Sequence, residues 1–138
     1  MLLNTRKIYL FLAGSILSLV GLYIGLMPTD YLSQFFIETD INVAVLSEMR
    51  GMGGNLLVFG IFILGGAFLK RLERVTMIIS CLIFASFSLF RALGIILDGM
   101  PGQSILLALI IEVIFALLAI PLLRRPKTSG LDSIATQD

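Results

Sequence analysis

Histidine and tryptophan are absent from the 138 residues, and cysteine occurs once, at position 81. The lack of histidine removes the commonest metal ligand and the commonest general base near neutral pH. Because Cys81 has no partner in the chain, it cannot form an internal disulfide, and its apolar surroundings favour a small buried side chain. We therefore predict no metal site and no cofactor.

Charged residues are also scarce, at 14% of the chain, whereas 58% of the residues are hydrophobic and the mean hydropathy is +1.04. A soluble domain of this size needs more polar residues to cover its surface, while a bundle in lipid needs apolar side chains outside as well as inside. The net charge of +1 gives no indication of a nucleic-acid partner. These values predict an integral membrane protein in contact with membrane lipids.

Four long apolar segments account for most of the chain, at about residues 8–27, 51–69, 75–97 and 103–123. The first contains no charged residue, and at about 1.5 Å per residue it can cross a hydrocarbon core of roughly 30 Å. The last two are joined by Asp98-Gly99-Met100-Pro101-Gly102, a sequence typical of a tight turn. We predict an all-α fold, an integral membrane four-helix bundle, in residues 1–127.

The remaining segments are short. Residues 29–37 mix apolar and polar side chains at a spacing that favours a short helix on the membrane interface, with an ordinary packed loop as the alternative. Residues 128–138 are predicted to form a loose cytoplasmic tail. Tyr9 and Tyr23 lie near the two ends of the first apolar segment, where amphipathic rings favour the headgroup region.

Basic residues gather on one side of the predicted spans. Eight of the ten flank the spans on that side: Arg6, Lys7, Lys70, Arg71, Arg74, Arg124, Arg125 and Lys127. The positive-inside rule then places both termini and the 70–74 loop in the cytoplasm.

Small residues recur along the first two segments. In lipid, such residues let helix backbones approach closely, which makes them the best packing signal. We interpret these residues as a contact within the bundle: Gly14, Ser18, Gly21 and Gly25 in the first segment, and Gly53, Gly54, Gly60 and Ala67 in the second. The alternative is that Gly21-x-x-x-Gly25 meets a second copy of the chain or another membrane protein.

Two opposite charges lie inside the third and fourth segments, Arg91 and Glu112, at similar depth below the predicted outer turn. Because a charge near the middle of a bilayer costs about 2.5–3.5 kcal/mol, we predict that they pair. Asp98 shares a helix face with Arg91. We predict that these charges line a cavity that opens outward, together with Asn55 and either Glu48 or Arg50. The alternative is that the ion pair only ties two helices together.

The pattern formed by these residues is Glu48-x-Arg50-x-x-Gly53-Gly54, then Arg91 followed by Asp98-Gly99-x-Pro101, then Glu112. It resembles an uncharacterised family of small bacterial four-span membrane proteins, distantly similar to the DoxX-like group. The resemblance implies a four-helix bundle in the bacterial cytoplasmic (inner) membrane, and it supplies no substrate.

Three functions follow as hypotheses. The first is an accessory protein that binds a small or lipidic ligand in the polar cavity or assists its transport. The second is a structural subunit of a membrane complex, or a homo-oligomer, whose buried charges only fix helix packing. The third is a membrane enzyme that uses Glu112 or Glu48 as acid or base, which the missing histidine and the absence of metal-ligand spacing disfavour.

Overall fold

The computed structural model describes residues 2–34 and 42–124, and within these ranges it contains helices and no strand. The helices are α1 (Leu2–Leu26), α2 (Pro28–Ser33), α3 (Val43–Phe68), α4 (Glu73–Asp98) and α5 (Gln103–Leu123). All except α2 are long and apolar enough to cross a membrane. The all-α four-helix membrane bundle predicted from the sequence is therefore confirmed. The predicted tail at 128–138 and the end of the predicted interfacial helix, 35–37, lie outside the described residues.

The helix boundaries follow from local chemistry. Pro28 occupies the first turn of α2, where its missing N–H costs nothing. Asn42 caps α3, since its side-chain oxygen accepts a hydrogen bond of 3.0 Å from the backbone nitrogen of Val45. Helix α4 ends at Asp98 and is capped by Gly99, whose φ of 97° is readily adopted only by glycine. Gly99 thus ends α4 in the turn that the sequence predicts between the last two spans.

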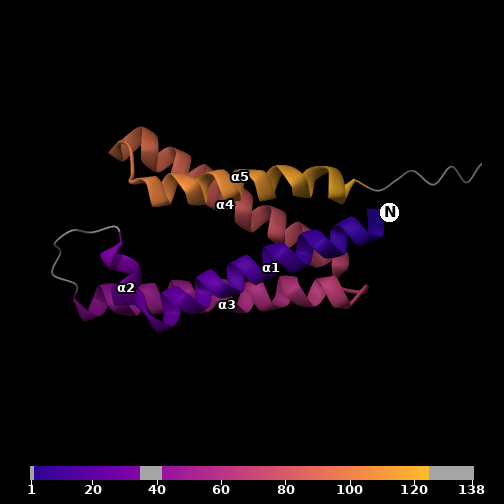
Figure 1. The fold of residues 1–138 in the computed structure, drawn as a ribbon, viewed down its shortest axis with the longest axis horizontal. Coiled ribbons are helices and arrows are strands. Elements are labelled where there is room, and N and C mark those ends of the chain that lie inside the picture. Colours follow the sequence, from indigo (N-terminus) through magenta and orange to yellow (C-terminus); the bar gives the residue numbers. More distant parts are fainter. Residues whose placement is uncertain (1, 35–41, 125–138) are drawn as a thin grey trace, which may run out of the picture.

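The four long helices form two antiparallel pairs, α1 with α3 and α4 with α5 (Figure 1). Helix α4 runs obliquely, so that its first half lies against the first pair and its second half lies beside α5. The pairs meet at the end that holds the N-terminus and diverge toward the α4–α5 turn. This divergence positions the candidate site described below.

Glycines allow α1 and α3 to touch along their backbones. A methyl group at Gly14 would lie 2.5 Å from the backbone nitrogen of Leu64, and one at Gly21 would overlap the backbone near Leu57. Gly53 and Gly60 face α1 in the same way, whereas the fit at Gly25 is looser, with 3.7 Å to the backbone nitrogen of Gly54. Gly54 itself differs from the packing prediction, because a methyl group there would meet nothing within 4 Å.

A buried polar junction joins the two pairs in the half of the bundle nearer the N-terminus. The hydroxyl oxygens of Tyr9 and Ser80 lie 3.0 Å apart, and the Tyr9 hydroxyl also donates to the backbone carbonyl of Phe115 at 3.1 Å. The Phe115 ring stacks on the Phe84 ring with their centroids 4.9 Å apart. Tyr9 is only 5% exposed. Its position in the sequence suggested the headgroup region, but Tyr9 instead links α1, α4 and α5 inside the bundle.

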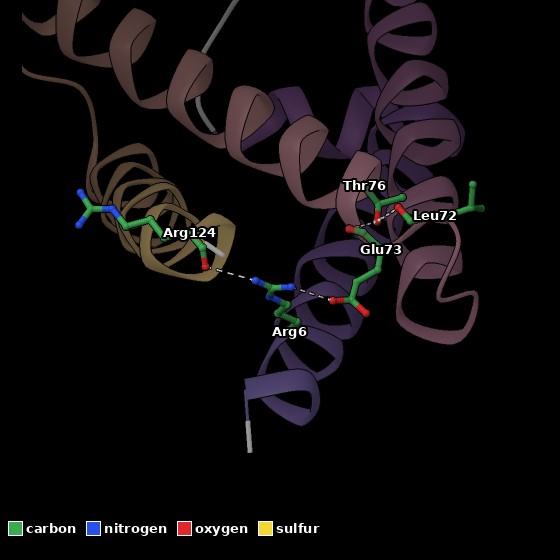
Figure 2. Close-up of polar contacts among 5 residues, drawn as sticks. All are labelled: Arg6, Leu72, Glu73, Thr76 and Arg124. Atoms are coloured by element: carbon green, nitrogen blue, oxygen red, sulfur yellow. Dashed lines mark hydrogen bonds and ion pairs between the residues drawn. The ribbon is translucent and has the colours of Figure 1, made fainter. Parts of the chain in front are cut away.

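A second polar contact closes the same end of the bundle (Figure 2). The Arg6 guanidinium donates from Nη1 to the Glu73 carboxylate and from Nη2 to the backbone carbonyl of Arg124, both at 3.4 Å. The Thr76 hydroxyl donates to the backbone carbonyl of Leu72 at 2.9 Å. The beginnings of α1 and α4 and the end of α5 thus lie at one end of the bundle, as an even number of crossings requires. The cytoplasmic location of that end stays a prediction.

Candidate functional site

Arg91 of α4 and Glu112 of α5 form an ion pair inside the spanning region. The Arg91 Nε atom lies 3.0 Å from Glu112 Oε1 and 2.9 Å from Oε2. The side chains are 26% and 12% exposed, respectively. The guanidinium also lies over the Phe87 ring, 5.9 Å from its centroid. The ion pair predicted from the sequence is present.

The geometry of this pair leaves part of the guanidinium unused. Both contacts to Glu112 come from Nε, so the carboxylate does not occupy the planar fork of Nη1 and Nη2. Across the described ranges 2–34 and 42–124, neither Nη atom has a hydrogen-bond acceptor in the protein. Arg91 therefore keeps donors available for an anionic or hydrogen-bonding group.

A cavity of about 490 Å³ lies between the two helix pairs where they diverge, and Arg91 and Glu112 form its polar wall. The rest of the lining is almost wholly apolar, with contributions from α1, α2, α3, α4 and α5. It includes Ile16, Val20 and Ile24; Tyr31; Met52 and Leu56; Phe84, Phe87 and Phe90; and Ala108 and Ile111. The cavity is therefore amphipathic, a long apolar surface with one charged patch.

The polar junction closes this cavity toward the end that holds the chain's N-terminus. Phe84 lines the cavity and is 2% exposed. Behind it lie Phe115, on which it stacks, and the Tyr9 hydroxyl bonded to Ser80. The Phe84 ring thus forms the floor of the cavity, supported from behind by Phe115 and the hydrogen-bonded hydroxyls, and the charged pair lies nearer the α4–α5 turn.

The other residues predicted for the site do not line this cavity. Glu48 is exposed on α3, and Asn55 lines a separate cavity of about 310 Å³ beside α4. The reason is helical geometry, because Gly53 packs on α1 and positions 48 and 55 lie on nearly the opposite face of α3. Arg50 projects toward α1, where its Nη1 donates to the backbone carbonyl of Gly25 at 2.9 Å.

Asp98 lies near Arg91 without pairing with it. Both residues line a third cavity of about 300 Å³ at the α4–α5 turn. Within the part of the chain that the structure describes, the Asp98 carboxylate forms no ion pair. Asp98 and Arg91 share a helix face, as the sequence predicts, but no ion pair joins them among the described residues, because Glu112 takes the Arg91 Nε atom.

Two polar contacts were missed by the sequence analysis. The first is the Tyr9–Ser80 junction, since serine is common in membrane helices and its spacing carried no signal. The second is the Arg6–Glu73 ion pair, in which Arg6 counted only as part of the basic flank. The available signal was an acidic residue, Glu73, in an otherwise basic loop. In the structure Glu73 is 6% exposed, and a buried carboxylate needs a partner.

The residues of the site set limits on its chemistry. No group of three or more histidine, cysteine, aspartate or glutamate residues that could hold a metal ion occurs in the ranges that the structure covers. The cavity presents a guanidinium, a carboxylate and apolar surface, which suit binding of an amphiphilic molecule.

Comparison with known proteins places the chain in a family. The model of a domain of unknown function (DUF4345) matches residues 5–123, which is most of the sequence. No curated protein and no solved structure shows significant similarity to the chain. The bacterial origin and the distant likeness to DoxX-like proteins, which the sequence resemblance implied, stay predictions. The chain belongs to the DUF4345 family, whose shared domain has no known function.

Proposed function

We propose that this protein is a membrane accessory protein that holds a lipidic ligand in the cavity between its two helix pairs. The observation that carries the proposal is a cavity of about 490 Å³ with an apolar lining and an arginine whose Nη atoms have no acceptor among the described residues. This volume lies within the range of about 300–1,000 Å³ that is usual for small-molecule sites. We place the protein in the bacterial cytoplasmic membrane, with the cavity in the outer half.

The position of the cavity suits a ligand that arrives from the bilayer. Helices α4 and α5 are largely exposed along their spans, and the cavity lies where they diverge from α1 and α3. An acyl chain can therefore enter sideways between the pairs without crossing the aqueous phase. The same contact with lipid tails makes membrane lipids the proposed partners of the protein.

A structural role for the Arg91–Glu112 pair is the second candidate, and the contact of Arg91 Nε with both oxygens of Glu112, which joins α4 to α5, favours it. However, a short turn already joins these two helices and fixes their register. A contact that fixes the packing of the two helix pairs would have to link α4 or α5 to α1 or α3, and the Arg91–Glu112 pair does not do so. A packing role alone does not explain the cavity beside the pair or the two Nη donors, which find no acceptor within the described ranges.

Filling the cavity tests the proposal. Ala108 lines it, so Ala108→Phe places a ring in the ligand's space, whereas Ala85→Phe adds the same ring on an exposed face of α4 that lines none of the three cavities. Each variant is extracted in a mild detergent and its bound lipids are identified by mass spectrometry. We expect wild type and Ala85→Phe to retain a lipid that Ala108→Phe lacks.

The outcomes separate the two candidates. Equal lipid content in all three folded proteins, or none in wild type, contradicts ligand binding in this cavity. If the double variant Arg91→Met/Glu112→Leu also keeps the wild-type lipid content, the ion pair serves packing only. That result contradicts the proposed role of Arg91 and Glu112 in ligand binding.

A further inference from the structure

We infer that the ligand is a lipid with a zwitterionic headgroup, in which Arg91 binds the phosphate and Asp98 binds a primary ammonium. The inference rests on the proposed function and specifies its ligand. The observation behind it is that Arg91 also lines the cavity of about 300 Å³ at the α4–α5 turn.

Arg91 lies between two cavities of different character. On one side is the large apolar cavity, and on the other is the cavity of about 300 Å³ at the turn. Apart from Arg91, the lining of the smaller cavity carries one charged side chain, that of Asp98. The remaining lining consists of glycine, proline and apolar residues, so two opposite charges face one small space. That space complements a group bearing both charges.

The Asp98 carboxylate is directed back along α4. Its Oδ2 atom lies 3.8 Å from the position that a methyl group at Gly94 would take, one turn closer to Arg91. Asp98 lies seven positions after Arg91, which corresponds to about 10 Å along the helix axis. No direct ion pair bridges this distance among the described side chains. A phosphate at the Arg91 fork with an ammonium two carbons away can fill the gap.

The location of Asp98 supplies an independent argument. It is the last residue of α4, where the helix dipole presents partial negative charge. A carboxylate at that end is unfavourable, and the last turn of α4 contains no basic residue to offset it. A bound ammonium would compensate both the carboxylate and the dipole.

The lining distinguishes this headgroup from the other common ones. A quaternary ammonium cannot donate hydrogen bonds and is usually held by aromatic rings, none of which line the cavity at the turn. A glycerol headgroup carries no cation for Asp98. A purely anionic headgroup would bind Arg91 but face repulsion from Asp98. Phosphate with a primary ammonium satisfies both residues.

The two cavities would also hold the ligand in the orientation that lipids have in a bilayer. The turn lies at the end of the spans, where headgroups are found, and the apolar cavity extends from Arg91 toward the middle of the bundle. A lipid bound this way keeps its tail toward the bilayer centre. It can therefore enter from one leaflet without turning over.

Native mass spectrometry of the detergent-solubilised full chain tests the inference. The protein is mixed with equal amounts of phosphatidylethanolamine, phosphatidylglycerol and phosphatidylcholine of identical acyl chains, and the bound fraction of each is measured. We expect phosphatidylethanolamine to predominate, and Asp98→Asn to lower its ratio to phosphatidylglycerol by about tenfold. Asp30→Asn, which removes an exposed carboxylate on α2, should leave the ratio unchanged.

Soluble phosphoethanolamine, the same headgroup without a tail, should fail to displace the bound lipid at equal concentration if the apolar cavity contributes as proposed. Lipid binding in wild type without preference for the amine, or a preference that Asp98→Asn retains, overturns the zwitterionic headgroup but leaves the proposed function intact. If no lipid binds to wild type, or Ala108→Phe binds as wild type does, the proposed function itself fails.

Discussion

The hydroxyl oxygens of Tyr9 and Ser80 lie 3.0 Å apart in the interior of the bundle, and the Tyr9 hydroxyl donates to the Phe115 carbonyl as well. This junction joins the two helix pairs inside the bundle. Toward the end that holds the N-terminus, the Arg6–Glu73 contact closes the bundle, and toward the α4–α5 turn the pairs separate. Among the described residues, the polar contacts between the two pairs are thus confined to one half of the bundle, and the cavity lies in the other half.

Tyr9→Phe removes the junction's hydroxyl and leaves the buried Ser80 oxygen without this partner. We expect the free energy of unfolding to fall by about 1–3 kcal/mol, since a buried polar group loses its hydrogen bond. The measurement is thermal or detergent-induced unfolding of the purified protein. Tyr23→Phe is the control: its hydroxyl accepts a bond from the Gln34 side chain in an exposed setting, so its loss should cost much less. Equal effects of the two substitutions would contradict the role assigned to the junction.

Gly60→Ala should destabilise the bundle strongly. A methyl group at that position would meet the backbone nitrogen and the hydroxyl of Ser18, so α1 and α3 would have to separate. We expect a loss of about 1–3 kcal/mol or more, the usual cost of overpacking. Gly65→Ala in the same helix meets nothing within 4 Å and should be neutral or slightly stabilising. Thermal unfolding of both variants checks this, and a harmless Gly60→Ala would show that the close approach is not needed.

A double-mutant cycle measures the coupling of Arg91 and Glu112. Each single change, Arg91→Met or Glu112→Leu, leaves one charge in the spanning region without its partner. We expect each to cost more than the double change, with a coupling energy of about 1–3 kcal/mol, because the apolar pair removes both desolvation costs. Additive effects in unfolding experiments would mean that the two side chains act independently.

Sidedness can be tested by labelling single cysteines. In a Cys81→Ala background, Leu69→Cys at the end of α3 retains every basic residue of the adjacent loop, and Met100→Cys lies in the α4–α5 turn. A maleimide that cannot cross membranes, applied to intact spheroplasts, should label position 100 and leave position 69 unlabelled until the cells are opened. The reverse pattern would invert the predicted orientation.

The sequence was sufficient to predict the four spanning helices and a close backbone contact within the bundle. The long apolar segments predict the number of spans, and glycines such as Gly14 and Gly60 predict close helix packing, because few other residues permit it. The structure shows that this contact lies between α1 and α3. The Arg91–Glu112 pair was predictable too, since two opposite charges at one depth on adjacent helices have few alternatives.

The membership of the pocket was less predictable. Periodicity places Glu48 and Asn55 on one face of α3, but which neighbour covers each face depends on the whole bundle. Once Gly53 faces α1, both polar residues turn away from the cavity. The floor of the cavity, formed by Phe84 with Phe115 stacked behind it, was equally hidden, because phenylalanine in a membrane helix is compatible with lipid, core or cavity.

An experimental structure of the protein in a lipid mesophase would test the presence of a bound amphiphile most directly. We predict elongated density between the two helix pairs, with its apolar part against Phe84 and Phe87 and its polar end within hydrogen-bonding distance of the Arg91 Nη atoms. Direct packing of Val20 against Ile111, with the cavity closed and no density beside Arg91, would contradict it.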